Sequence, residues 1–212
     1  MKFNLIAVFF LIVCLQTLTF AKSDFEYANE AVDSGNYEKA ISLYKKSANK
    51  GDLESQVELG YVYKLGELDT KIDSEESLKW FLKAAKSGDS EGQFQAASFY
   101  ITKGDFKEAR RWLGKAAKQD NSNAMCLLGD LYYHGQGVEK DFNKAMKIYK
   151  LAVMLKNPLA SYQLGTMYYN GHGISVNYAE ALRLFKQGGK RGKATLNQIC
   201  NASPEFCKQY QQ

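Results

Sequence analysis

Few residues of this 212-residue chain have the types and spacing that chemistry needs. Its only histidines are His134 and His172, and neither lies in a segment rich in Cys or Glu that could supply further zinc ligands. No nucleophile elbow or metalloprotease helix is present. The glycine-rich segment 188–194 superficially resembles a phosphate loop, but its glycine spacing is wrong and Ala194 replaces the required Ser or Thr. We therefore expect no catalytic residues, no metal and no cofactor.

The cysteines suggest a structural role instead. Cys200 and Cys207 are seven residues apart, and in one continuous helix about 10 Å of rise would separate them, too far for a disulfide. Ser203-Pro204 breaks the helix between them, because Ser can cap a helix and Pro favours its first turn. In an oxidising compartment we expect a Cys200–Cys207 disulfide that pins the C-terminal cap. Cys126 is left as a packed or free thiol.

The N-terminus has the pattern of a secretory signal peptide. Met1-Lys2 precedes an apolar run from Phe3 to Phe20, and small residues at Thr19 and Ala21 suit cleavage after Ala21. The alternative is an uncleaved membrane anchor, since about 18 residues almost span a bilayer, although polar residues dilute the run. Cleavage predicts a periplasmic or secreted protein with no stable membrane insertion.

The charge balance does not indicate a nucleic-acid partner. Removal of residues 1–21 takes away one lysine and no acid, so the net charge falls from +5 to +4. The cations at Lys186, Lys190, Arg191 and Lys193 lie where one predicted helix ends, and cations suit the negative end of the helix dipole. No RNA- or DNA-binding motif is present.

The elements that position these residues are repeated helices. One pattern, with small residues at the outer places and large apolar residues in the middle, occurs five times with spacing i, i+3, i+4, i+7, i+8, which is one face of a helix. The first small residue of each set is Ala40, Ser77, Ala109, Ala145 and Ala181. A fixed repeat of this kind indicates stacked units rather than one globular core.

A second helix precedes each of the last four sets, and it also has a repeated pattern. A Leu or Ala is followed by a small residue and then, three places on, by a Tyr. Gly in a helix costs about 1 kcal/mol relative to Ala, so its recurrence here predicts close approach by a neighbouring helix. Acidic side chains at Asp52, Asp89 and Asp120 are predicted to cap these helices.

These residues carry a family resemblance. The segment Leu128-Gly129 through Val138, followed by Lys144-Ala145, resembles the Leu-Gly-x-x-Tyr-x-x-Gly-x-Gly-Val pattern of Sel-one-like repeats. Two shorter units, before Ala40 and Ala109, look more like tetratricopeptide repeats. The resemblance covers roughly residues 25–193. Departures are Leu68 in place of a loop Gly, Gly188-Gly189 in place of Ala-Ala, and Lys156 in place of a helix-ending Gly.

The resemblance implies an all-α, right-handed α-solenoid of stacked helix-turn-helix repeats. We expect a signal peptide over 1–21, a solenoid of about five helix pairs over 22–195, and a C-terminal cap over 196–212. First helices line the concave side in proteins of this kind, and exposed aromatic side chains are good interface anchors. The predicted partner-binding residues on that side are Tyr61, Lys64, Phe94, Ile101, Asp130, Tyr133, Tyr162 and Tyr169. The alternative for Phe94, Cys126 and Tyr162 is that they pack against the neighbouring unit.

The leading functional hypothesis is a non-catalytic scaffold that binds a protein or peptide on its concave face. A narrower hypothesis is an immunity protein that neutralises a secreted toxin such as a lipase, because some proteins that resemble this chain are thought to do so. A third is a weak β-lactamase or penicillin-binding protein, as described for cysteine-rich relatives. Those relatives carry a cysteine pair in nearly every unit, whereas this chain has one plausible pair.

Overall fold

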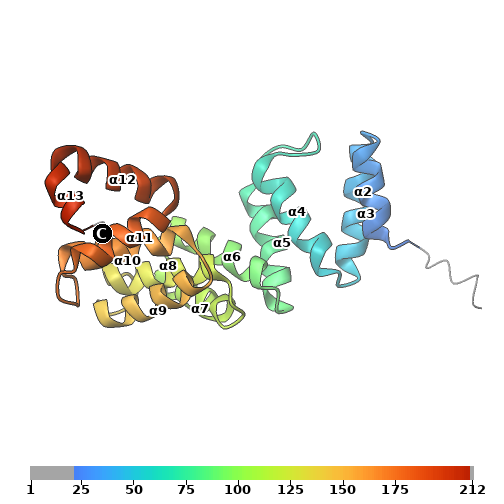
Figure 1. The fold of residues 1–212 in the computed structure, drawn as a ribbon. Coiled ribbons are helices and arrows are strands. Elements are labelled where there is room, and N and C mark those ends of the chain that lie inside the picture. Colours follow the sequence, from blue (N-terminus) through green and yellow to red (C-terminus); the bar gives the residue numbers. More distant parts are fainter. Residues whose placement is uncertain (1–21, 211–212) are drawn as a thin grey trace, which may run out of the picture.

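The computed structural model describes residues 22–210, so the predicted signal peptide and its cleavage site lie outside the described residues. The described part consists of helices without strands, which confirms the prediction of an all-α solenoid. Figure 1 shows the helices following one another along a curved path. The pairs are α2 (Asp24–Asp33) with α3 (Tyr37–Asn49), α4 (Leu53–Leu65) with α5 (Ser74–Lys86), α6 (Ser90–Thr102) with α7 (Phe106–Ala117), α8 (Ser122–His134) with α9 (Phe142–Met154), and α10 (Pro158–Asn170) with α11 (Tyr178–Gln187). Two further helices, α12 (Gly189–Ala202) and α13 (Pro204–Tyr210), end the described chain.

Local sequence signals set where these helices begin. In each of α2 to α11, a Ser, Asp or Asn side chain just before the helix accepts a hydrogen bond from a backbone N–H of the first turn. Asp52 and Asp89 cap α4 and α6 as predicted. The prediction for Asp120 is wrong: Asn121 caps α8 through a 2.9 Å bond from the Ala124 N–H, and Asp120 instead adopts the left-handed conformation in the preceding turn.

The core is a row of clusters between successive helices. The large residue in the middle of each second-helix pattern is fully or nearly fully buried, as at Phe81, Leu113, Tyr149 and Phe185. A Cβ atom added to Gly129 of α8 would lie 2.5 Å from the Tyr149 ring of α9, closer than real atoms allow. The recurring glycine therefore lets an aromatic ring rest directly on the first helix, as its recurrence predicts.

The loops within the long units share a left-handed residue at one place despite a change of residue, although the first of them has a second left-handed residue at Asp69, with φ of 57°. Gly137 and Gly173 have φ of 66° and 71°, and Leu68, at the equivalent place two residues after Gly66, has φ of 53°. Lys156 likewise has a positive φ of 59° where a Gly is usual. The left-handed conformation costs an L-residue roughly 1–2 kcal/mol. Packing of Leu68 against the core cluster that contains Tyr44 and Leu59 offsets part of that cost.

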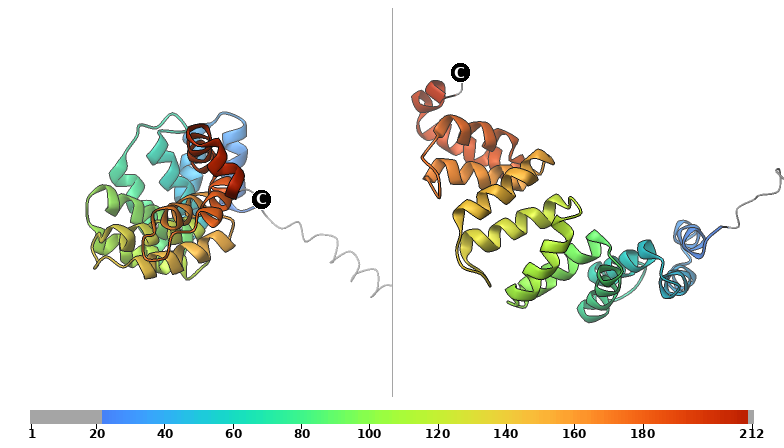
Figure 2. Two further views of the ribbon diagram at one scale, coloured as in Figure 1. Left: turned by 60° about the vertical axis from the view of Figure 1, so that its left-hand side comes forward. Right: turned by 90° about the horizontal axis from the view of Figure 1, so that it is seen from below.

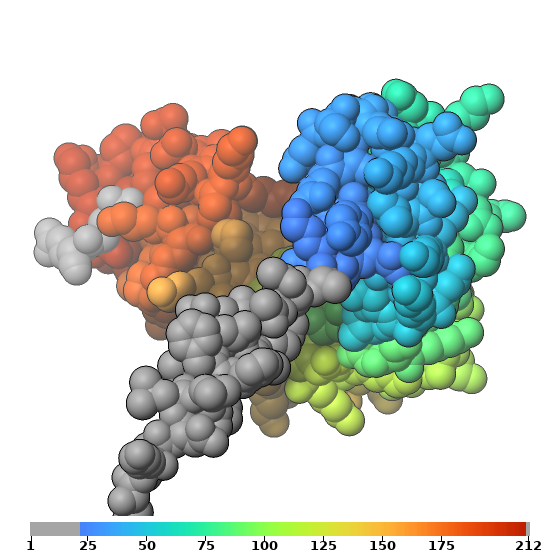
Figure 3. Space-filling model, turned by 90° about the vertical axis from the view of Figure 1, so that its right-hand side faces the viewer, coloured from blue at the N-terminus to red at the C-terminus, as the bar shows by residue number. Residues whose placement is uncertain are grey.

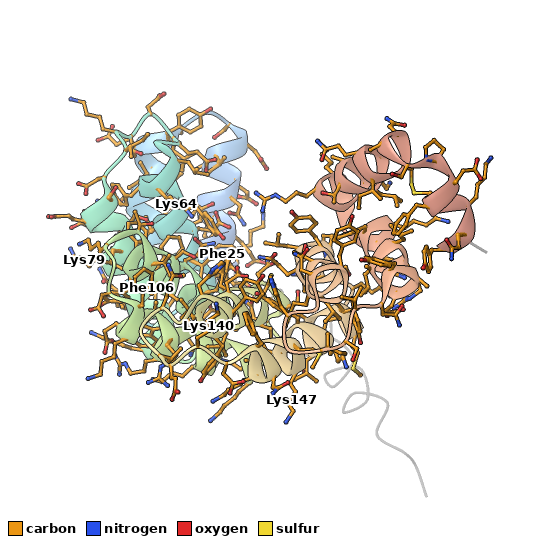
Figure 4. The ribbon with its side chains drawn as sticks, turned by 90° about the vertical axis from the view of Figure 1, so that its left-hand side faces the viewer. Phe25, Lys64, Lys79, Phe106, Lys140 and Lys147 are labelled. Carbon is orange, nitrogen blue, oxygen red and sulfur yellow. A yellow bond between two sulfur atoms is a disulfide. The ribbon has the colours of Figure 1, made fainter. Side chains whose placement is uncertain are left out.

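The pairs curve around a hollow. Figure 1 places α7 and α9 along the lower outer edge, and Figure 2 shows the same curved course from two further directions. In the space-filling view of Figure 3, the N-terminal arm and the C-terminal arm stand apart with a hollow between them. Figure 4 shows Lys79 of α5 and Lys147 of α9 on the outer side, and Lys64 of α4 nearer the hollow. First and second helices thus present different surfaces.

Candidate partner-binding face

The eight predicted binding residues all lie on first helices of the pairs, on α4, α6, α8 and α10. All eight side chains are half-buried. We call these residues the first-helix face. Their partial burial means that each touches its own repeat or the next one, and the contacts differ from one end of the solenoid to the other.

Between α4 and α6, a hydrogen-bonded cluster joins two repeats. The Tyr61 hydroxyl donates to the Glu91 carboxylate and accepts a 2.7 Å bond from Gln95 Nε2. Lys64 Nζ donates to Gln95 Oε1 at 2.7 Å, and the Tyr61 ring packs edge-on against Phe81 with centroids 5.2 Å apart. Burial, with the Glu91 carboxylate beside the hydroxyl, raises the pKa of Tyr61, so this phenol remains a neutral donor.

Between α8 and α10, a carboxylate holds the equivalent place. Asp130 Oδ1 accepts a 2.6 Å bond from the Tyr149 hydroxyl and a 2.8 Å bond from Gln163 Nε2. Burial raises the pKa of Asp130, and the two donors partly oppose that shift. Tyr61 and Asp130 occupy the same repeat position, as do Gln95 and Gln163. The same contact therefore occurs twice along the solenoid. In each case a glutamine of the next first helix donates a hydrogen bond to the previous repeat.

Tyr133 is held by residues of its own pair and of the following one. Its hydroxyl and His172 Nδ1 share a 2.6 Å hydrogen bond. The Phe142 ring stacks on His172 with centroids 5.2 Å apart and lies 5.1 Å from the Tyr133 ring. Burial raises the pKa of Tyr133. Two rings, Phe142 at the start of α9 and His172 in the loop after α10, thus fix the Tyr133 side chain of α8.

The C-terminal helices cover the last part of the first-helix face. Tyr162 packs on Phe185, with centroids 5.9 Å apart, and the Arg191 guanidinium lies 6.0 Å from its ring centre. Tyr169 lines a shallow pocket closed by Gln198, Ile199, Ala202, Ser203 and Phe206 of α12, α13 and the residue between them. One end of this face is therefore bounded by the C-terminal cap.

The remaining predicted residues serve packing between repeats. Phe94 and Ile101 of α6 pack against the core cluster that contains Trp112 and Leu113 of α7. Cys126 is 1% exposed, so its side chain is packed in the core, in line with the packing alternative. Burial raises the pKa of the Cys126 thiol, as expected of an inert rather than a reactive cysteine.

Sequence reasoning missed the partners of the face: Glu91, Gln95, Phe142, Gln163 and His172. One signal was present for two of them. Gln95 follows Tyr61 by 34 residues and Gln163 follows Asp130 by 33, close to one repeat length. The packing of Phe142 against His172 had no such signal, because it depends on how a loop of one unit folds onto the next.

The structure joins Cys200 and Cys207 by a disulfide, with Cα atoms 5.3 Å apart. As predicted from Ser203-Pro204, α12 ends at Ala202 and α13 begins at Pro204, so the chain bends between the two cysteines. Among residues 22–210, no three His, Cys, Asp or Glu side chains gather in a way that could hold a metal ion. No helix of the same residues has the length and apolar character needed to cross a membrane.

Comparison with known families agrees with this geometry. The Sel1 repeat model matches residues 27–52, 53–89, 122–157 and 158–193, and a tetratricopeptide repeat model matches 90–123. The chain belongs to the Sel1 repeat family. Of the two short units predicted to be tetratricopeptide-like, the one containing α6 and α7 is matched as such, whereas residues 27–52 match the Sel1 repeat.

Solved Sel1 repeat structures have the same fold. The chain is similar to c5321, a protective antigen of uropathogenic Escherichia coli with an SLR fold, with 26% identity and a TM-score of 0.77 over 88% of this chain and 43% of that one. It is also similar to a Sel1 repeat protein from Oxalobacter formigenes, with 27% identity and a TM-score of 0.73 over 82% of this chain and 74% of that one.

A curated relative is much longer. The ERAD-associated E3 ubiquitin-protein ligase component HRD3 of Candida glabrata is 26% identical over 122 residues, which are 54% of this chain and 15% of that protein. The chain thus spans a small part of this relative and less than half of c5321. Sel1 repeat proteins are protein-interaction scaffolds and are generally non-catalytic.

Proposed function

We propose that this protein is an exported, non-catalytic scaffold that binds a protein or peptide segment on the first-helix face. The observation that carries the proposal is the set of hydrogen bonds that cross between repeats and hold side chains of this face in place. Tyr61 and Asp130 are each fixed by a glutamine of the next first helix. Preorganised side chains bind with a smaller loss of conformational entropy than mobile ones.

The chemistry of the face suits a partner with both apolar and polar groups. Tyr61 and Tyr133 each carry a ring and a hydroxyl, and Lys64 supplies a cation beside Tyr61. Aromatic side chains with a polar tip are enriched among the residues that dominate binding energy at protein interfaces. The pocket at Tyr169 offers a place where the segment would end against the C-terminal cap.

The proposed location outside the cytoplasm rests on two features. The N-terminal sequence has a signal-peptide pattern, and Cys200 and Cys207 form a disulfide of the kind that persists in oxidising compartments. The narrower hypothesis, an immunity protein, stays a prediction. Identification of the partner tests it. For the β-lactamase hypothesis, turnover of a chromogenic β-lactam by the purified protein is the deciding assay.

The experiment starts from residues 22–212 used as bait for an envelope fraction, with captured proteins identified by mass spectrometry and then purified. Changing Tyr133→Ala and Tyr169→Ala together is expected to weaken the affinity of the purified partner at least about tenfold, because aromatic anchors carry much of an interface. The affinity is measured by isothermal titration calorimetry. Circular dichroism checks that the double variant keeps its helices.

A matched control removes exposed apolar groups from the outer side. Leu151→Ala with Met154→Ala changes two exposed residues of α9, and we expect this double variant to bind the partner with unchanged affinity. Equal affinity of the folded Tyr133/Tyr169 variant and the wild-type protein would contradict the proposed face.

A further inference from the structure

The last turn of α9 carries an exposed apolar patch. Leu151, Met154 and the following Leu155 are 52%, 77% and 43% exposed. Their spacing of i, i+3 and i+4 places them side by side on one side of the helix end. We call these three residues the α9 patch. Exposed apolar side chains that cluster in this way mark contact sites more often than isolated ones do.

The repeats themselves show that the fold does not need this patch. Leu151, Met154 and Leu155 lie six, nine and ten residues after Ala145, the first small residue of their second-helix pattern. At the same places the other four units carry polar or charged residues: Lys46, Asn49 and Lys50; Lys83, Lys86 and Ser87; Lys115, Lys118 and Gln119; and Gln187, Lys190 and Arg191. Since four units do without an apolar residue here, stacking does not explain the three in α9.

The patch lies in a strongly basic part of the chain. Residues 140–212 contain 11 Lys and Arg against 3 Asp and Glu, a net charge of +8, whereas residues 1–139 contain 17 against 20, a net charge of −3. Lys147 lies one turn before Leu151, and Lys150 lies one turn before Met154. Glu180 of the next second helix is near Lys150, but its carboxylate is already paired with Arg183.

The position of the patch separates it from the first-helix face. Figure 4 shows Lys147 of α9 pointing away from the molecule on the outer side, opposite the hollow between the two arms. Lys147 and Lys150 are both exposed. The helix end therefore presents apolar tips with cations one turn behind them.

We propose that the α9 patch docks the protein on an anionic phospholipid surface. The exposed Leu and Met side chains would enter the boundary between headgroups and acyl chains, and Lys147 and Lys150 would lie at the level of the phosphates. Charge complementarity selects this occupant over a second copy of the chain, because two patches facing each other would bring their lysines together. Docking through α9 leaves the first-helix face free for a protein partner, so this proposal does not depend on that function.

The test measures co-sedimentation of residues 22–212 with phospholipid vesicles. This part of the chain is suitable because all four core clusters draw only on residues after Asp24. We expect binding to vesicles of mixed phosphatidylcholine and phosphatidylglycerol, and at least about tenfold weaker binding to phosphatidylcholine alone. Added salt should weaken the binding to the anionic vesicles.

The matched variants come from the chain's own repeats. Leu151→Gln, Met154→Asn and Leu155→Gln introduce residue types that Gln187, Asn49 and Gln119 already provide at the same places, so the triple variant should fold. We expect it to bind anionic vesicles at least about tenfold more weakly than wild type. Leu65→Gln with Ile72→Gln, which changes two exposed apolar residues elsewhere, should leave binding unchanged.

A fluorescence readout distinguishes insertion from adsorption by charge alone. Met154→Trp should shift its emission to the blue on anionic vesicles, because the indole enters a less polar environment. Absence of vesicle binding overturns the proposal. Equal binding by the triple variant, or binding without a blue shift, overturns the role of the patch. A wild-type dimer in analytical ultracentrifugation that the triple variant loses would assign the patch to a second copy instead.

Discussion

At the scale of single residues, half-buried polar groups join one repeat to the next. Asp130 is the clearest case, because its carboxylate accepts bonds from Tyr149 of the same pair and Gln163 of the next. The sequence indicated that Asp130 lies on the first-helix face, but not that it is tied into the stack. Periodicity gives the side of a helix on which a residue lies, whereas its partners depend on the rotation between neighbouring pairs.

The half-buried carboxylate of Asp130 predicts a specific dependence of stability on pH. The raised pKa of Asp130 means that the folded state holds this proton more tightly than the unfolded state, whose Asp titrates near about 3.9. The Asp130 contribution to the free energy of unfolding therefore falls as pH rises from about 3.9 through the raised value. We expect the free energy of unfolding of Asp130→Asn, relative to that of wild type, to increase with pH over this range. Urea unfolding at a series of pH values measures this difference. A relative loss over the same range would mean that the pKa is lowered instead.

Asp130→Ala serves as the contrasting variant. It removes the acceptor of the Tyr149 hydroxyl, whose residue is fully buried. An unsatisfied buried polar group costs about 1–3 kcal/mol, so the alanine variant should be less stable than the asparagine variant, whose side-chain oxygen can still accept.

At the scale of helices, the sequence predicts most of what the structure contains. The five repeated sets are the second helices of the five pairs, and the capping residues, with the exception at Asp120, mark where helices begin. The role of each helical glycine was harder to predict, because some glycines make room for a neighbouring side chain and others do not. Gly129 receives the Tyr149 ring, whereas Gly114 of α7 has nothing within 4 Å of the place where a Cβ would lie.

These two helical glycines make a matched pair of variants. Gly129→Ala should lower the free energy of unfolding by about 1–3 kcal/mol, since the new methyl group overlaps the ring of Tyr149. Gly114→Ala should raise it by up to about 1 kcal/mol, because Ala favours the helix and meets no neighbour. Chemical unfolding of both variants measures the difference. Equal effects of the same sign would contradict the role assigned to Gly129.

At the scale of the whole molecule, curvature separates a first-helix face from an outer surface made by second helices. The sequence predicted the solenoid and the helix faces, but not how α12 and α13 pack over Tyr162 and Tyr169. The bend at Ser203-Pro204 places α13, and no repeat pattern specifies its direction. The two surfaces suit different partners: a protein segment on the inner side, and an anionic lipid surface at the α9 patch.

Site-specific photo-crosslinking in the cells that make the protein shows whether a protein partner lies against the first-helix face. The photoreactive residue p-benzoylphenylalanine replaces either Lys64 of α4 or Lys79 of α5, which lie on different sides of one helix pair in Figure 4. We predict a discrete cross-linked protein from position 64 and none from position 79. A cross-link from position 79 alone, or the same product from both positions, would contradict partner binding on the first-helix face.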